Sequence, residues 1–85
     1  MELIETSKFR KIRKKIRGEK EREALKAAVM SVIENPEAGK KLKGEFRDLR
    51  SLAYSVKGQG RRLIYKVEEN ALVLFSFGPR EGIYR

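Results

Sequence analysis

Residues 61–85 read RRLIYKVEENALVLFSFGPREGIYR, and this stretch decides the fold. Apolar and polar side chains alternate from 61 to 68, which is typical of a strand with one buried face. Residues 71–77 are almost all apolar, which favours a central strand buried on both faces. Because the connection between the two runs is short and polar, we expect an antiparallel hairpin. The inward face of the first strand should carry Leu63, Tyr65 and Val67.

Two arginines flank this hairpin at one end. Gly78-Pro79 ends the second strand, which leaves Arg80 just beyond the core. Paired antiparallel strands run in opposite directions, so Arg62 near the start of one strand should lie beside Arg80 after the end of the other. A guanidinium group stays charged and matches the geometry of a phosphate. The pair is therefore a candidate phosphate clamp, with Tyr84 four residues further along.

Composition limits the classes of function. The 85 residues suffice for one small domain, which we take as 1–85. The net charge of +9 favours RNA, DNA, an anionic membrane or an acidic protein as partner. The absence of cysteine and histidine excludes disulfides, thiolate nucleophiles and the commonest general base, and we expect no metal and no cofactor. Because no apolar run could span a bilayer and no signal peptide opens the chain, the expected location is the cytoplasm.

The N-terminal half predicts an edge strand and two helices. Residues 1–6 are the candidate edge strand, and Ser7 is a candidate N-cap. Apolar residues at helical spacing predict one helix near 8–17, ended by Gly18, and a second near 20–34, ended by Asn35-Pro36. Both apolar stripes must face a single sheet, so we expect an antiparallel helical hairpin packed together on one of its faces.

Cations cover most of the first helix and the segment after the second. The seven cations of the first helix are uninterrupted by any acid, which favours nucleic-acid binding, although a solvated helix face has the same pattern. Residues 36–47 contain lysines between glycines but no phosphate-loop pattern, which favours a linker. The candidate RNA-binding residues are Lys8, Lys11, Lys14, Lys15, Lys40, Lys41 and Lys43.

One further strand completes the expected fold. Residues 49–57 alternate between apolar and polar, and Gly58-Gln59-Gly60 turns the chain into the 61–68 strand. The expected order is β-α-α-β-β-β. This is an α+β fold in which the N-terminal helical hairpin packs on a small antiparallel sheet. The C-terminal three-stranded meander is its core, and the N-terminal strand is a candidate fourth member.

These segments, taken in order, resemble the RelE/ParE superfamily of type II toxins over nearly the whole chain. Each motif is weak alone, whereas their order and spacing together are fairly specific. RelE-like members are endoribonucleases that cut messenger RNA without a metal, typically in the ribosomal decoding site, and ParE-like members poison DNA gyrase. An acidic antitoxin encoded beside the toxin holds both kinds inactive. The resemblance rests on the helical hairpin with Asn35-Pro36, Leu42-Lys43-Gly44, Leu49-Arg50, Arg62-Leu63-Ile64-Tyr65, Gly78, Arg80 and Tyr84.

The resemblance implies catalytic roles for Arg62, Arg80 and Tyr84. Arg62 and Arg80 would bind the non-bridging phosphate oxygens while the RNA 2′-OH attacks, and Tyr84 would stack on a base or transfer a proton. RelE-like members also carry lysines on the preceding strand, where Lys57 is the only candidate here. Either Tyr84 or Lys57 would need neighbouring cations to act as a base. The structural alternatives are a strand-face cation for Arg62 and an edge-closing residue for Tyr84.

The sequence therefore predicts a RelE-like toxin that cuts messenger RNA at the ribosome. The expected partners are messenger RNA, the ribosome and an acidic, RelB-like antitoxin, with a toxin–antitoxin heterotetramer as one assembly and no membrane. The alternative is a ParE-like gyrase inhibitor with no chemistry of its own. A third interpretation, a basic RNA-binding module without toxicity, explains the charge but not the ending with Arg80 and Tyr84.

Overall fold

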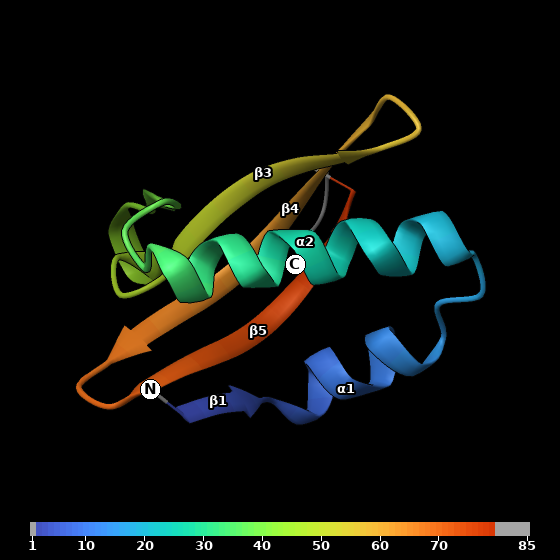
Figure 1. Ribbon diagram of the computed structural model, residues 1–85. Helices are drawn as coiled ribbons and strands as arrows, with labels where there is room; N and C mark the ends of the chain where they lie inside the picture. The colour runs from blue at the N-terminus through green and yellow to red at the C-terminus, as the bar shows by residue number, and fades with distance from the viewer. Residues whose placement is uncertain (1, 80–85) are drawn as a thin grey trace.

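The computed structural model describes residues 2–79, in which two helices cover one face of a five-stranded sheet (Figure 1). This is the α+β class that the sequence predicts. In chain order the elements are β1 (Glu2–Glu5), α1 (Ser7–Lys14), α2 (Glu19–Glu34), β2 (Lys40–Lys41), the 3-10 turn η1 (Gly44–Phe46), β3 (Arg50–Val56), β4 (Gln59–Glu68) and β5 (Ala71–Pro79).

The strands lie in the order β1-β5-β4-β3-β2. The four strands from β2 to β5 are antiparallel, and the predicted β4–β5 hairpin is confirmed. β1 pairs with β5 in parallel, so the sheet is mixed and not wholly antiparallel as expected. No tight turn joins β1 to β5, because both helices and the other strands intervene, and so nothing imposes an antiparallel pairing. Lys40 and Lys41, expected in a linker, form β2 at the far edge.

Both helices share one face of the sheet as predicted, but they pack over different strands. α1 contacts β5 and β1, whereas α2 lies over β3 and β4. α2 ends before Asn35-Pro36 as expected, and α1 is shorter than predicted because it stops at Lys14. The N-cap of α1 is Thr6 and not Ser7: the Thr6 Oγ1 accepts a hydrogen bond from the Phe9 N–H at 3.1 Å.

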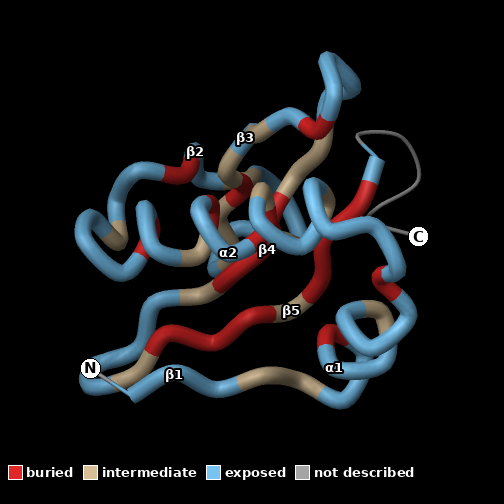
Figure 2. The backbone as a smooth tube through the Cα atoms, turned by 45° about the vertical axis from the view of Figure 1, so that its right-hand side comes forward, coloured by how far each residue is buried: buried red, intermediate tan, exposed pale blue. Residues whose placement is uncertain are grey.

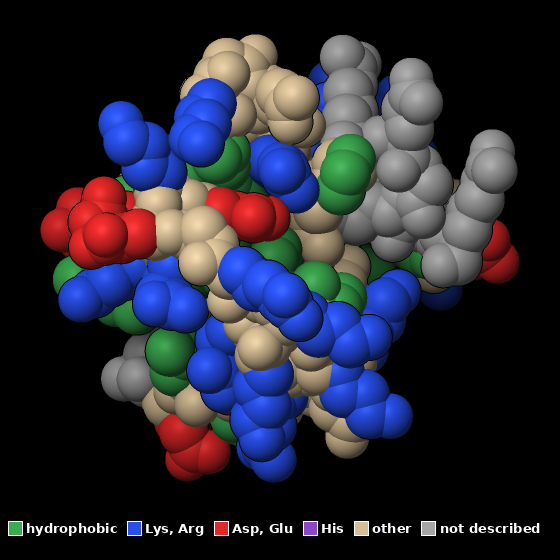
Figure 3. Space-filling model, turned by 90° about the vertical axis from the view of Figure 1, so that its right-hand side faces the viewer, with side chains coloured by type: hydrophobic (Ala, Val, Ile, Leu, Met, Phe, Trp, Pro, Cys, Tyr) green, Lys and Arg blue, Asp and Glu red, His purple; other side chains and the backbone are tan. Residues whose placement is uncertain are grey.

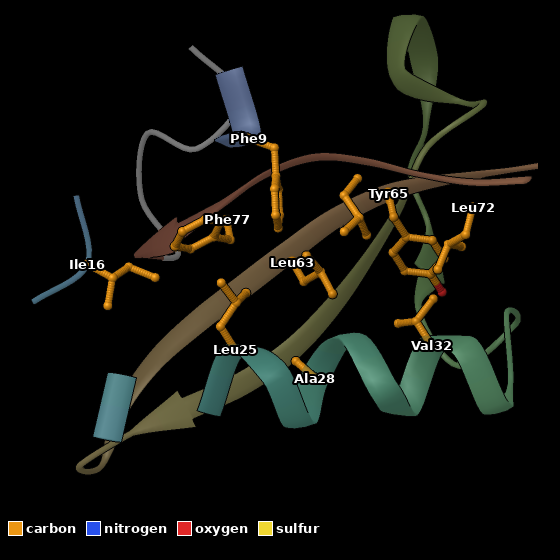
Figure 4. Close-up of a cluster of buried hydrophobic side chains, with 10 residues drawn as sticks. Phe9, Ile16, Leu25, Ala28, Val32, Leu63, Tyr65, Leu72 and Phe77 are labelled. Carbon is orange, nitrogen blue, oxygen red and sulfur yellow. The ribbon is translucent and has the colours of Figure 1, made fainter. Parts of the chain in front are cut away.

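The core lies between the helices and the central strands, where side chains from both layers point toward one another (Figure 4). Burial is concentrated along β5 and the middle of β4, while the helices are exposed on their outer sides (Figure 2). Phe9 of α1 meets Phe77 of β5 edge to face, with ring centroids 5.1 Å apart. Burying one such phenylalanine contributes about 1.5–3 kcal/mol. This contact fixes α1 to the β5 side of the sheet.

β5 contains a bulge that sequence alternation does not reveal. Ile64 of β4 lies opposite Ser76, but the next residue, Tyr65, lies opposite Leu74, which leaves Phe75 unpaired. The predicted inward face of β4 is confirmed: Leu63 and Tyr65 are fully buried, and Val67 lies opposite the core residue Leu72 on the same face, although it is 38% exposed. Val67 lies near the end of the β4–β5 hairpin, which projects past the helices (Figure 1).

The Tyr65 hydroxyl ties the α2–β2 connection to the core. It accepts a hydrogen bond from the Gly39 N–H at 2.7 Å and donates one to the Pro36 carbonyl at 2.8 Å. Arg50 donates a further bond to the Gly39 carbonyl at 2.8 Å. A Cβ on Gly39 would lie only 2.5 Å from the Tyr65 oxygen, so this position requires glycine. These hydrogen bonds therefore hold in place the segment that leads into β2 and its two lysines.

Candidate functional site

Arg62 lies on β4 and faces away from the helices. Its neighbour Leu63 is in the helix-covered core, and Arg61 reaches Glu21 of α2 at 3.3 Å, so alternation turns Arg62 toward the opposite face. There the Arg62 Nη1 donates a hydrogen bond of 3.2 Å to the Ser51 hydroxyl, which is buried. Among residues 2–79, Ser51 is the one hydrogen-bond partner found for this half-buried guanidinium, which leaves other N–H groups for a ligand.

The pairing of Arg62 bears on the predicted phosphate clamp. Arg62 lies opposite Gly78, and Arg61 lies opposite Pro79, where the described part of β5 ends. Arg80 follows Pro79 directly in sequence, but Arg80 and Tyr84 lie outside the described residues. Their proximity to Arg62 therefore stays a prediction.

Lys57 does not lie on a strand. It occupies the β3–β4 turn together with Gly58, and both residues have positive φ, 51° and 82°. Two such angles are typical of a type I′ hairpin turn. The residue of β3 opposite Arg62 is Ala53, and Lys57 comes four residues later, about 13 Å further along at roughly 3.3 Å per residue. β3 itself, RSLAYSV, contains no lysine.

The seven candidate RNA-binding lysines form two separate groups. Lys8, Lys11 and Lys14 lie on α1 and Lys15 directly after it, near the β1–β5 edge, whereas Lys40 and Lys41 form β2 at the other edge and Lys43 follows. Four strand spacings separate those edges, which is roughly 19 Å. All seven side chains are exposed. Lys and Arg side chains gather at the end of the molecule seen in Figure 3, which bears the α1–α2 connection.

Two contacts were not foreseen from the sequence. Glu5 of β1 pairs with Arg13 of α1 and holds the pKa of that guanidinium above its ordinary value, chiefly through the hydrogen bond, so an acid does neutralise part of the cationic helix. Ser51 is the partner of Arg62. No sequence motif identifies Glu5 or Ser51 as a contact residue, because each contact joins two elements that are separate in the sequence.

The tyrosine on β3 is poorly suited to act as a base. Burial of its ring raises the pKa of Tyr54 to about 12, although the charge of Arg61 acts in the opposite direction. Within residues 2–79, no cluster of three or more acidic side chains could hold a metal ion. None of the helices in this range is long and apolar enough to cross a membrane.

A family model described as ParE-like toxin of type II bacterial toxin-antitoxin system matches residues 3–85. The chain belongs to this family. Solved structures agree with the assignment. The toxin resembles a chain of the intact RelBE toxin–antitoxin complex of Escherichia coli, with 30% identity, a TM-score of 0.73, and coverage of 94% of this chain and 96% of that one. None of the curated proteins matches it.

Two further structures have the same fold. The isolated RelE toxin of E. coli is 30% identical to this toxin, with a TM-score of 0.73 and coverage of 94% of this chain and 84% of that one. The YoeB/ParE toxin from Agrobacterium tumefaciens is 18% identical, with a TM-score of 0.75 and coverage of 91% and 95%. The predicted membership of the RelE/ParE superfamily is therefore confirmed.

Proposed function

We propose that this toxin is a RelE-like endoribonuclease that cleaves messenger RNA at the ribosome without a metal. The observation that carries the proposal is the half-buried Arg62 on the sheet face opposite α1 and α2, hydrogen-bonded to Ser51 and paired with the strand that leads to Arg80. The 30% identity to E. coli RelE over 94% of this chain supports it. Its proposed setting is the cytoplasm, with a RelB-like antitoxin as partner in a heterotetramer.

The chemistry assigns a distinct task to each residue. The 2′-OH gives its proton to a general base and its oxygen attacks the adjacent phosphorus, so negative charge grows on the non-bridging oxygens. The bond to the 5′ oxygen then breaks, and that oxygen takes up a proton. Arg62 and Arg80 donate hydrogen bonds to those oxygens in the transition state. Tyr84 stacks on a base or transfers a proton. The exposed lysines of α1 and β2 bind flanking phosphates without regard to sequence.

The proton-transfer role follows from the position of Lys57 relative to Arg62. Lys57 lies in a hairpin turn about 13 Å along the ladder from the position opposite Arg62. Lys57 therefore lies outside the strand position that the family resemblance gives to a lysine. In this proposal Tyr84 therefore acts as the general base. Positioning of the RNA by the ribosome supplies part of the catalysis.

The test compares Arg62→Ala with Lys66→Ala. Lys66 lies on the same strand and faces the same side four residues away, so it controls for lost charge. Loss of one transition-state donor lowers the rate by about 10²–10³. We expect Arg62→Ala to lose ribosome-dependent cleavage of messenger RNA by that factor while Lys66→Ala stays near wild type. Equal activity of the two variants would remove Arg62 from the site.

A ParE-like gyrase inhibitor is the second candidate. The specific observation in its favour is that β3 carries no lysine, which leaves the nuclease without the expected proton-transfer group. The two functions separate in parallel assays of purified toxin. A nuclease cuts ribosome-bound messenger RNA and leaves gyrase supercoiling unchanged, whereas a gyrase poison gives the reverse.

A further inference from the structure

Two polar residues are buried among residues 2–79, and both are serines on the sheet face opposite the helices. Ser51 of β3 is 3% exposed, and Ser76 of β5 is 5% exposed. Leu52 and Phe77, the next residues along each strand, belong to the helix-covered core or pack against it, so alternation turns both serines to the other face. Each serine pairs with Ile64, one from either side of β4. The two hydroxyls therefore occupy equivalent positions in the sheet.

One of these two serines holds Arg62. The Arg62 Nη1 donates a hydrogen bond of 3.2 Å to the Ser51 hydroxyl. For the Ser76 hydroxyl, no hydrogen bond is found within residues 2–79. The contact with the arginine therefore distinguishes Ser51 from its counterpart on the other side of β4.

Small residues surround Arg62 on three sides. Ala53 of β3 and Gly78 of β5 lie directly opposite it, and Gly60 precedes it on the same face of β4. Apart from its chain neighbours, a Cβ at either glycine would meet no atom of residues 2–79 within 4 Å. Residues this small cannot fix a guanidinium group at the end of a long, flexible stem. The hydrogen bond to Ser51 is therefore the directional contact that fixes it.

Ser51 restrains Arg62 without neutralising its charge. The preceding residue, Arg61, pairs with Glu21 at 3.3 Å, and that carboxylate offsets the charge of its arginine. Among residues 2–79, no ion pair is found for Arg62. Because a serine hydroxyl is neutral, Arg62 keeps its full positive charge for a phosphate group.

We propose that Ser51 is a positioning residue, which holds the Arg62 guanidinium in the orientation that meets the scissile phosphate. An arginine side chain loses rotamer freedom when it is fixed. With the Ser51 bond in place, that loss occurs when the chain folds and not when the RNA binds, so the donor is ready as negative charge develops. The catalytic part of this inference rests on the proposed function, whereas the restraint on Arg62 does not.

The catalytic part is tested by comparing Ser51→Ala with Ser76→Ala in ribosome-dependent cleavage of messenger RNA. Both changes remove one buried hydroxyl from the same face, at equivalent positions on either side of Ile64. We expect Ser51→Ala to lower kcat by about tenfold with little change in KM, and Ser76→Ala to stay near wild type. The loss is smaller than for Arg62→Ala, because the guanidinium is still present. Ser51→Thr, which keeps the hydroxyl, should recover most of the rate.

A double-mutant cycle with Arg62→Ala separates positioning from a merely structural role. In the Arg62→Ala background, Ser51→Ala should cause no further loss of cleavage, because the side chain that it positions is already absent. A structural role predicts the same loss in both backgrounds, and that result would overturn the proposal. Circular dichroism and urea unfolding check the fold of each variant.

The restraint itself is measured by NMR relaxation of the Arg62 side-chain Nε–H group, a readout that needs no cleavage. Its order parameter should fall in Ser51→Ala and keep the wild-type value in Ser76→Ala. An unchanged order parameter in folded Ser51→Ala overturns the proposal, whatever the toxin's target. A fall in order with undiminished cleavage overturns the catalytic part. A wild-type toxin that cleaves no messenger RNA rejects the proposed function and the catalytic role of Ser51 with it, whereas the NMR measurement still decides the restraint, so the two failures are distinguishable.

Discussion

The Tyr65 side chain is fully buried, yet its hydroxyl makes two hydrogen bonds to backbone groups that are distant in sequence. Alternation in residues 61–68 predicts the burial of the ring but not the partners of the oxygen. Those partners, Pro36 and Gly39, come from the connection after α2, and only the folded chain brings them to β4. The same limit applies to Arg62. The sequence predicts it as a site residue but does not predict its hydrogen bond to Ser51.

Tyr65→Phe should destabilise the toxin measurably. The change leaves the buried Gly39 N–H without its acceptor, and an unsatisfied buried donor costs about 1–3 kcal/mol. Urea denaturation of the two proteins measures the difference. Tyr54→Phe is the control, since no hydrogen bond from its hydroxyl is found within residues 2–79. A loss no larger than that of the control would mean that the Tyr65 hydroxyl is not a structural tie.

At the scale of whole elements, local signals place the strands and α2 well. Alternation and turn residues predict β3, β4 and β5, and Asn35-Pro36 predicts the end of α2 because the residue before proline resists the helical region. Long-range pairing is less visible. The bulge at Phe75 changes which residues of β5 face the helices, and the parallel pairing of β1 has no local signature.

Thr6 connects two of these features. Its Oγ1 accepts from the Phe9 N–H at the start of α1 and donates to the carbonyl of the bulged Phe75 at 3.0 Å. One side chain thus caps the helix and satisfies a carbonyl at the break in the β4–β5 ladder. The sequence favours Ser7 as the cap because serine is as good a capping residue and lies one position closer to the predicted helix start.

Replacing Thr6 by Ala should therefore cost more than replacing Ser7 by Ala. Loss of an N-cap side chain alone costs about 0.5–2 kcal/mol, and the Phe75 bond adds to this. Ser7→Ala should change the free energy of unfolding by less than about 0.5 kcal/mol, as is usual for exposed positions. Thr6→Ser, which keeps the hydroxyl, should recover most of the loss. If thermal or urea unfolding shows that Ser7→Ala lowers the free energy of unfolding more than Thr6→Ala does, then Ser7 and not Thr6 is the N-cap.

At the scale of the whole molecule, charge and apolar surface should contribute differently to the binding of an antitoxin. The net charge of +9 attracts an acidic chain over distances of about 10 Å, the Debye length at 0.1 M salt. Long-range attraction raises the rate of encounter, whereas the residence time depends on buried apolar anchors. An open groove of about 440 Å³ between α1 and α2, beside β1, places both kinds of group together, with cations such as Lys14 and Lys26 on its rim and Met30 and Ile33 among its lining residues.

Association of toxin and antitoxin should therefore be fast and sensitive to salt. We expect the association rate to fall by about tenfold or more between low and high ionic strength, because steering raises rates by that order and is screened by salt. The dissociation rate should change much less. Lys14→Gln/Lys26→Gln, on the rim, should lower the association rate and flatten its salt dependence, whereas Met30→Glu/Ile33→Glu should mainly raise the dissociation rate. Stopped-flow measurements across a salt series separate the two effects. If neither the association rate nor the affinity responds to salt, charge does not recruit the antitoxin, and the apolar groove acts alone.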